Sequence, residues 1–237
     1  MRIVILAAAA SLLAAGAAQA NPIYDAVADF SISNGNPNGV WSYGYGTPGS
    51  APTAYDSTTT SCAGIAGLSC WYASSENANN LPAVGMNETG SPIVTGTVDI
   101  PTNVLFMHPT AANTGGNNNF STMVQFNAPG AANYAFAGSF QADDIYGNAN
   151  GVTVSIFDGS VELFSALLIG YGNSVSFSGI AALGATDALD FIVSANGGSY
   201  YNDSTGLILS IQDVPEPASI AMLGLGLLGL AGLRRRA

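Results

Sequence analysis

Residues 151–159 read GVTVSIFDG, and branched apolar residues alternate with hydroxyl residues from Val152 to Ile156. Successive side chains of a β-strand point to opposite faces, so a period of two predicts a strand with one buried and one exposed face. The Asp158-Gly159 pair that follows is a typical turn sequence. Together with a further predicted strand over 161–169, this stretch predicts antiparallel pairing.

The same period of two recurs along the chain on both sides of this stretch. Further strands with an alternating apolar face are predicted at 134–140, 175–177, 189–193 and 207–211, and additional strands at 24–32, 40–45, 93–100, 103–107 and 120–127. About ten short strands at roughly 8–15-residue spacing, without a convincing amphipathic helix, predict an all-β protein. We expect an antiparallel β-sandwich of the jelly-roll type, because the competing β-helix would require a fixed repeat period that the sequence lacks.

The charges are distributed very unevenly. The chain has fifteen acidic and four basic residues, and no Lys or Arg lies between residues 3 and 233. Apart from an amino terminus, the body between the two ends has one possible positive group, His108. Such a body cannot neutralise phosphate groups, so the composition excludes a nucleic-acid-binding protein.

The N-terminal segment has the layout of a secretory signal. Arg2 supplies a positive start, residues 3–18 are apolar apart from one serine, and Ala18-Gln19-Ala20 is a small-residue cleavage site. We expect a signal peptide over residues 1–20, with cleavage between Ala20 and Asn21. A buried first helix or an uncleaved anchor is the alternative interpretation.

The C-terminal segment has three consecutive parts. Val214, Pro215, Glu216 and Pro217 form a rigid, non-helical start, because each proline fixes its own φ and disfavours helix in the residue before it. The apolar run over 218–233 predicts a helix about 24 Å long, short of the roughly 30 Å hydrocarbon core of a membrane. The chain closes with the basic cluster Arg234, Arg235 and Arg236, which favours a cytoplasmic end.

This order of motif, apolar segment and basic end resembles the PEP-CTERM sorting tail of Gram-negative bacteria. The resemblance implies export by the secretion machinery, a transient inner-membrane intermediate held through residues 218–233, and processing by an exosortase. It also implies display at the cell surface or in the extracellular matrix, where exopolysaccharide is a common partner. The implied organisation is a signal peptide over 1–20, a β-sandwich ectodomain over 21–213 and a sorting tail over 214–237. A plain C-terminal anchor is the alternative.

A loop-rich insertion is predicted over residues 48–90, where Ser, Thr, Asn and Gly are frequent and periodicity is weak. It contains both cysteines, Cys62 and Cys70. An exported protein meets an oxidising compartment, so we expect a disulfide between them. A metal or redox pair is disfavoured, because the spacing is not C-x-x-C and no third ligand is nearby.

Oxygen-rich loops make calcium the one cofactor that the sequence suggests. Ca²⁺ prefers carboxylate, amide and carbonyl oxygens. Asp143 and Asp144 lie in one such loop and Asp203 in another. The alternative for these loops is a solvated acidic surface without a metal.

Catalytic residues do not stand out in the sequence. A Ser-His-Asp arrangement would depend on His108, for which a role in a turn or at a sheet edge is more plausible. A glycosidase would use paired carboxylates, and the available acids include Asp143, Asp144, Asp158, Glu162, Asp187 and Asp190. No pair among them is distinguished, so no catalytic residue is assigned.

Aromatic residues supply the remaining functional signal. An exposed aromatic ring with polar neighbours suits a sugar, and the candidates are Trp41, Tyr43, Trp71, Tyr200 and Tyr201. The alternative is that Trp41 and Tyr43 are core residues of the sandwich. The sequence thus favours a non-enzymatic surface or matrix protein, structural or carbohydrate-binding, over the alternative of a secreted polysaccharide hydrolase.

Overall fold

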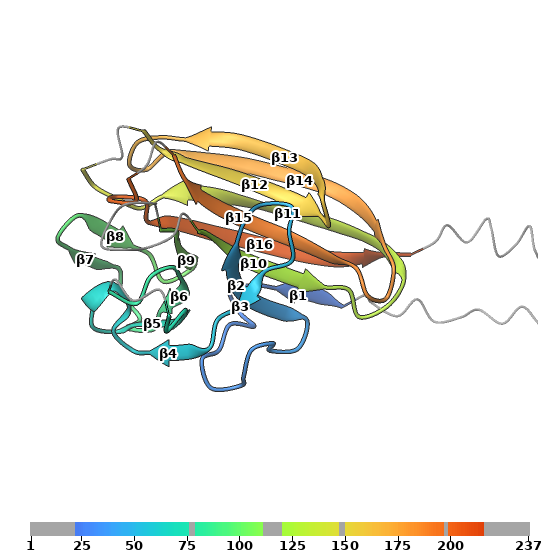
Figure 1. The fold of residues 1–237 in the computed structure, drawn as a ribbon, viewed down its shortest axis with the longest axis horizontal. Coiled ribbons are helices and arrows are strands. Elements are labelled where there is room, and N and C mark those ends of the chain that lie inside the picture. The colour runs from blue at the N-terminus through green and yellow to red at the C-terminus, as the bar shows by residue number, and fades with distance from the viewer. Residues whose placement is uncertain (1–21, 76–78, 111–119, 147–149, 197–198, 216–237) are drawn as a thin grey trace, which may run out of the picture.

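The computed structural model describes residues 22–75, 79–110, 120–146, 150–196 and 199–215. Two antiparallel sheets face each other and form a β-sandwich (Figure 1). The described residues contain no α-helix, and a 3-10 turn, η1 (Cys62–Gly64), is their only helical turn. None of their helical segments is long and apolar enough to cross a membrane.

Among the described residues, the two large sheets contain eight and six strands. The first sheet has the order β14 (Ser174–Leu183), β11 (Ala132–Ala142), β16 (Thr205–Val214), β9 (Leu105–His108), β6 (Ala83–Asn87), β5 (Leu68–Tyr72) and β4 (Ser57–Thr59), with β1 (Ile23–Asp25) also on β16. The second has the order β13 (Val161–Leu168), β12 (Val152–Asp158), β15 (Ala188–Ala195), β10 (Ser121–Asn127), β2 (Trp41–Gly46) and β3 (Thr53–Ala54). A separate hairpin pairs β7 (Ile93–Thr95) with β8 (Val98–Ile100).

The strands from β9 to β16 form a jelly roll. Four of them have the order β9-β16-β11-β14 and the other four the order β10-β15-β12-β13. The chain crosses to the opposite sheet at every step except the β12–β13 hairpin, which is the connectivity of a double Greek key. The predicted antiparallel β-sandwich of jelly-roll type is therefore confirmed.

Two predicted strands are shorter or divided in the structure. The strand predicted over 24–32 ends at Asp25, because the Asp25 carboxylate accepts hydrogen bonds from the backbone N–H groups of Val27 and Ala28, at 2.9 and 3.0 Å. This side-chain bonding replaces the ladder with a turn. The strand predicted over 93–100 is a hairpin, whose turn contains Gly96 at φ 56°.

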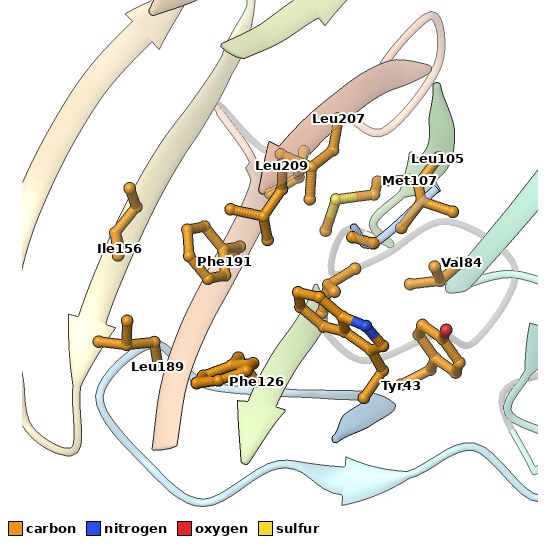
Figure 2. Packing of buried hydrophobic residues seen from close by; sticks show 14 of the residues in the cluster. Tyr43, Val84, Leu105, Met107, Phe126, Ile156, Leu189, Phe191, Leu207 and Leu209 are labelled. Atoms are coloured by element: carbon orange, nitrogen blue, oxygen red, sulfur yellow. The ribbon is translucent and has the colours of Figure 1, made fainter. Parts of the chain in front are cut away.

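The main core fills the space between the two sheets. Figure 2 shows Phe191 of β15 between Ile156 of β12 and Leu209 of β16, and all three side chains are fully buried. Burying a large apolar side chain contributes roughly 1.5–3 kcal/mol to folding. Trp41 and Tyr43 belong to the same core, each 1% exposed, which confirms the core interpretation of these two residues.

A second, smaller core lies at the end of the sandwich where β4 to β8 gather (Figure 1). Its centre is the predicted disulfide, since Cys62 and Cys70 are joined and both fully buried. Leu68, Phe106 and Tyr200 pack in the same cluster. The segment 48–90, predicted as a loop-rich insertion, contains the short strands β3 to β6. Strands β4 to β6 extend the first sheet beyond β9, and β3 pairs with β2 in the second sheet.

Three buried carboxyl groups have raised pKa values, and their sequence neighbourhood offers no Lys or Arg to stabilise their charge. Burial is the main cause in each case and raises the pKa of Asp143 to about 7, of Asp190 to about 6 and of Asp203 to about 8. Hydrogen bonds oppose the effect in part: Gln141 donates to Asp143 at 2.8 Å, and Gln125 donates to Asp190 at 2.9 Å.

We expect the disulfide to stabilise the fold by about 2–3 kcal/mol, because it closes a short loop in the unfolded chain. The double variant Cys62→Ala/Cys70→Ala should unfold at a lower denaturant concentration than the oxidised protein. Adding a reductant to the unfolding series should lower the midpoint of the wild type and leave that of the double variant unchanged. Equal midpoints for oxidised wild type and double variant would contradict this expectation.

We also expect stability to fall as the pH rises from about 4 to about 8. An aspartate in an unfolded chain releases its proton near pH 3.9, whereas Asp143, Asp190 and Asp203 retain theirs in the folded state until about pH 6–8. Between these limits the folded state binds more protons, so each group lowers the free energy of unfolding by up to about 1.4 kcal/mol per pH unit.

Melting temperatures at pH 5 and pH 8 measure this effect, and the value at pH 5 should be higher. His108 acts in the opposite direction, because burial lowers its pKa and the folded state then loses stability as the pH falls below about 6.5. The variant Asp190→Asn keeps an acceptor for Gln125 and should reduce the pH dependence. An unchanged pH dependence in this variant would show that Asp190 does not contribute.

Candidate functional site

A cavity of about 680 Å³ opens beside the second core. Its apolar floor consists of Leu81, Val98 and Phe106, which all belong to that core. Residues 63–66 after the first cysteine form one wall, and the turn between β7 and β8 forms another. The cavity has the size and mixed lining of a small-molecule site.

Backbone hydrogen bonds fix the β7–β8 hairpin as a cavity wall. The N–H of Asp99 donates to the carbonyl of Asp143 at 2.8 Å, and the N–H of Ile145 donates to the carbonyl of Thr97 at 2.6 Å. Val98 also forms an isolated bridge with Asp144. The hairpin is thus attached to the chain just after β11, which places Thr97 and Val98 at the cavity.

Two adjacent tyrosines form the aromatic part of the lining. The rings of Tyr200 and Tyr201 stack with centroids 4.8 Å apart and an interplanar angle of 23°. Tyr200 is 6% exposed and anchored in the second core, whereas Tyr201 is 62% exposed. Asn202 follows at φ 64°, a conformation that asparagine tolerates well, and turns the chain back toward β16.

His108 lines the same cavity at the end of β9, where burial favours its neutral form. Burial lowers the pKa of its imidazole, and Nδ1 lies 2.8 Å from the carbonyl oxygen of Pro109. A carbonyl oxygen only accepts, so Nδ1 carries the proton and Nε2 is left as an acceptor. The ring makes an edge-to-face contact with Tyr200, with centroids 5.9 Å apart.

Asp144 is the one acid among the described residues that line the cavity. Its carboxylate is held from two sides: the Thr97 hydroxyl donates to Oδ1 at 2.9 Å, and the N–H of Ser204 donates to Oδ2 at 2.6 Å. The side chain is 2% exposed. These bonds fix the direction of the carboxylate and use two of its roughly four lone-pair positions.

The three acids predicted to bind calcium lie at this end of the sandwich but in different surroundings. Asp143 lies over Gly206 of β16, beside Gln141. Asp203 and Asp144 both line a second void of about 10 Å³, which the 202–205 segment borders. Within the described ranges, no group of three or more His, Cys, Asp or Glu residues is placed to hold a metal ion. Calcium binding therefore stays a prediction.

The predicted aromatic platforms separate into two groups. Trp71 is 8% exposed and its indole N–H donates to the carbonyl of Ser31 at 2.8 Å, so it packs with Trp41 and Tyr43 in the main core. Because these rings are buried, the prediction that they bind carbohydrate is wrong. Tyr200 and Tyr201 line the cavity, and their sugar-binding role stays a prediction.

Sequence analysis did not identify the other polar residues of the cavity. Thr97 and Ser204 are ordinary hydroxyl residues, and His108 was best explained as part of a turn. Thr97 meets Asp144 because the β7–β8 hairpin folds onto the end of β11, whereas Ser204 reaches Asp144 from the segment before β16 and His108 lies at the end of β9. A further set of predictions lies outside the described residues: the signal peptide with Ala18, Ala20 and Asn21, Glu216 and Pro217, the apolar run over 218–233, and Arg234, Arg235 and Arg236.

Comparison with solved structures finds remote likenesses. The carbohydrate-binding module CBM51 of a Clostridium perfringens GH95 protein, in complex with methyl-galactose, is 9% identical over 72% of this chain and 99% of that chain, with a TM-score of 0.34. A CBM36-1 domain of a multidomain xylanase from the hindgut metagenome of Trinervitermes trinervoides is 9% identical over 56% and 98% of the two chains, with a TM-score of 0.28. Pika GITRL is 10% identical over 40% and 79%, with a TM-score of 0.28. With TM-scores this low, none of these likenesses is used as an argument for function.

Comparison with sequence families finds a match that begins at the C-terminal end of β16. No curated protein matches the chain. The PEP-CTERM protein-sorting motif matches residues 213–236, which include Val214 and Pro215. The match confirms the resemblance of the tail and identifies the chain as an exported protein that carries a PEP-CTERM protein-sorting motif.

Proposed function

We propose that this protein is a non-enzymatic, carbohydrate-binding component of the cell surface or extracellular matrix, with the cavity beside the second core as its binding site. The observation that carries the proposal is the stacked Tyr200–Tyr201 pair in a cavity of about 680 Å³. The PEP-CTERM motif supports an exported location, where matrix polysaccharide is available as a ligand. Processing of the tail by an exosortase is part of the proposal.

The chemistry of the lining suits a sugar ring. A sugar presents C–H groups on its faces and hydroxyl groups around its edge, so it needs an aromatic surface and hydrogen-bonding side chains together. Tyr201 offers an exposed ring, and Asn79, Thr95 and Asn202 bring amide and hydroxyl groups to the same cavity. Burial raises the pKa of the Tyr200 hydroxyl, which therefore stays protonated and able to donate.

The charged groups of the cavity support binding rather than hydrolysis. Glycosidases use two carboxyl groups about 5–10 Å apart, and Asp144 is the single carboxyl group in the described lining. Neutral His108 has its Nδ1 proton committed to Pro109. The other acids considered for catalysis, Asp143, Asp158, Glu162, Asp187 and Asp190, do not line the cavity.

Calcium is not required by this proposal. It stays a prediction for Asp143, Asp144 and Asp203, and a chelator arm in the binding experiment tests it. Binding that survives the chelator would assign the affinity to the protein side chains alone.

We expect Tyr201→Ala to weaken binding of the exported protein to matrix polysaccharide by about tenfold or more, which corresponds to about 1.4 kcal/mol. The variant removes the most exposed ring of the cavity while Tyr200 keeps its place in the second core. A glycan pull-down measures the effect, and a reducing-sugar assay on the same samples should detect no turnover.

Tyr146→Ala is the matched control, because Tyr146 is 75% exposed and lies outside the cavity lining. It should bind like the wild type. Equal losses in both variants would contradict the assignment of the site. Release of reducing sugar that an acid-to-amide change abolishes would favour the hydrolase instead.

We expect the released protein to begin at Asn21 and to lack Arg234–Arg236, because a sorting tail is removed during processing. Intact-mass measurement of protein from the medium or cell surface tests both ends. A variant with alanine at Pro215, Glu216 and Pro217 should keep the tail and remain with the membrane fraction. Arg-terminated peptides in most of the released wild-type protein would contradict processing.

A further inference from the structure

We propose that the ligand of the cavity is a polysaccharide with free amino groups, of the glucosamine type, bound through its ammonium groups. This inference rests on the proposed function and specifies its ligand class. The charges of the cavity, the tyrosine pair and the charge of the whole body each support it.

The first argument is the orientation of the Asp144 carboxylate. Thr97 and Ser204 hold its two oxygens in place from within the protein, and further lone-pair positions remain for a ligand. The side chain is shielded from bulk water at 2% exposure, which strengthens a charge-assisted hydrogen bond to an ammonium group. A neutral sugar would gain only an ordinary hydrogen bond from the same oxygen.

The second argument is that the described lining offers a cation two compatible partners besides the carboxylate. Tyrosine rings attract a cation over their faces, and the exposed ring of Tyr201 stacks on that of Tyr200. Neutral His108 has Nε2 as an acceptor, because its proton sits on Nδ1. No Lys or Arg lines the cavity among the described residues, so a ligand cation meets no repelling side chain.

The third argument is the field of the whole body. Fifteen acids and no Lys or Arg between residues 3 and 233 make the exported body strongly negative. Such a field attracts a polycation and repels uronate or sulfate polymers, with a range of roughly 8 Å at physiological ionic strength. The negative charge of the whole body and the carboxyl group of Asp144 in the cavity therefore favour the same ligand class, a polysaccharide with ammonium groups.

The test compares matched oligosaccharides on the exported protein, with chelator present so that no divalent ion bridges the charges. The probes are a glucosamine hexamer at a pH where its amines are protonated, the fully N-acetylated hexamer, a glucose hexamer and a galacturonate hexamer. We expect the glucosamine hexamer to bind at least about tenfold more tightly than its acetylated counterpart, and the galacturonate hexamer to bind most weakly. Added salt should reduce the difference.

Two variants that each remove one negative charge test whether Asp144 causes the preference for the amine hexamer. Asp144→Asn should remove most of the preference for the amine hexamer over its acetylated counterpart, whereas Asp158→Asn, at the end of β12 and outside the cavity lining, should keep the preference. Comparable losses in both variants would overturn the role of the cavity carboxylate. The wild-type ligand series provides a test that does not depend on how either variant folds.

The two proposals fail in distinguishable ways. Equal affinity for the amino and acetylated hexamers, or tighter binding of the galacturonate, would overturn the amine preference and leave carbohydrate binding in place. Binding of none of the four hexamers would overturn both.

Discussion

The ladder between β11 and β16 is the interaction on which the rest of the structure depends. It runs from the Asn133–Val214 pair to the Ala142–Thr205 pair and joins the centre of the first sheet. The opposite edge of β16 is divided between β9, at Thr205–Leu207, and β1, at Ser210–Gln212. Because β6, β5 and β4 are attached to β9, these strands at the cavity end of the first sheet are connected to β16 through β9.

The two ends of β16 lead to the cavity and to the sorting motif. Just before its first residue, the chain contributes four described residues to the cavity lining: Tyr200, Tyr201, Asn202 and Ser204. At its other end, the sorting motif begins at Asp213, which still pairs with Tyr134 of β11. The match to the motif therefore starts inside the sheet, with no spacer between the folded body and the first motif residues. Pairing of one strand thus positions both one part of the cavity lining and the start of the sorting tail.

Alternation in the sequence was sufficient to predict the sandwich, since Val152, Val154 and Ile156 point inward as their spacing requires. The disulfide followed from export and from the presence of two cysteines. The end of β1 was not predictable from periodicity, because the carboxylate of Asp25 bonds to local N–H groups and overrides an apolar pattern. The hairpin within 93–100 depends on a single glycine, Gly96, which can adopt positive φ.

The cavity was harder to predict, for a physical reason. Tyr200 and Tyr201 were identified from residue type, but type alone did not separate them from Trp41, Tyr43 and Trp71, which are buried. Whether a ring is buried depends on which sheet face covers it, and this is a long-range property.

The surroundings of Asp144 are likewise set by tertiary contacts. Thr97 lies on the hairpin and Ser204 precedes β16, so neither is a neighbour of Asp144 in sequence. Their hydrogen bonds satisfy the buried carboxylate in part, while the chain supplies no Lys or Arg between residues 3 and 233 to neutralise it. A buried carboxylate without a cation is costly unless the proton or a ligand cation compensates its charge.

The neighbouring acids Asp143 and Asp144 lie in different surroundings. At Asp143, burial raises the pKa to about 7, so the proton is the compensating charge over much of the physiological range. Asp144 lines the cavity, and its carboxyl group accepts hydrogen bonds from the Thr97 hydroxyl and the Ser204 N–H. The same lack of basic residues that makes the folded body sensitive to pH thus leaves the carboxyl group of Asp144 without a Lys or Arg partner among the described residues, as the proposed binding of a cationic group requires.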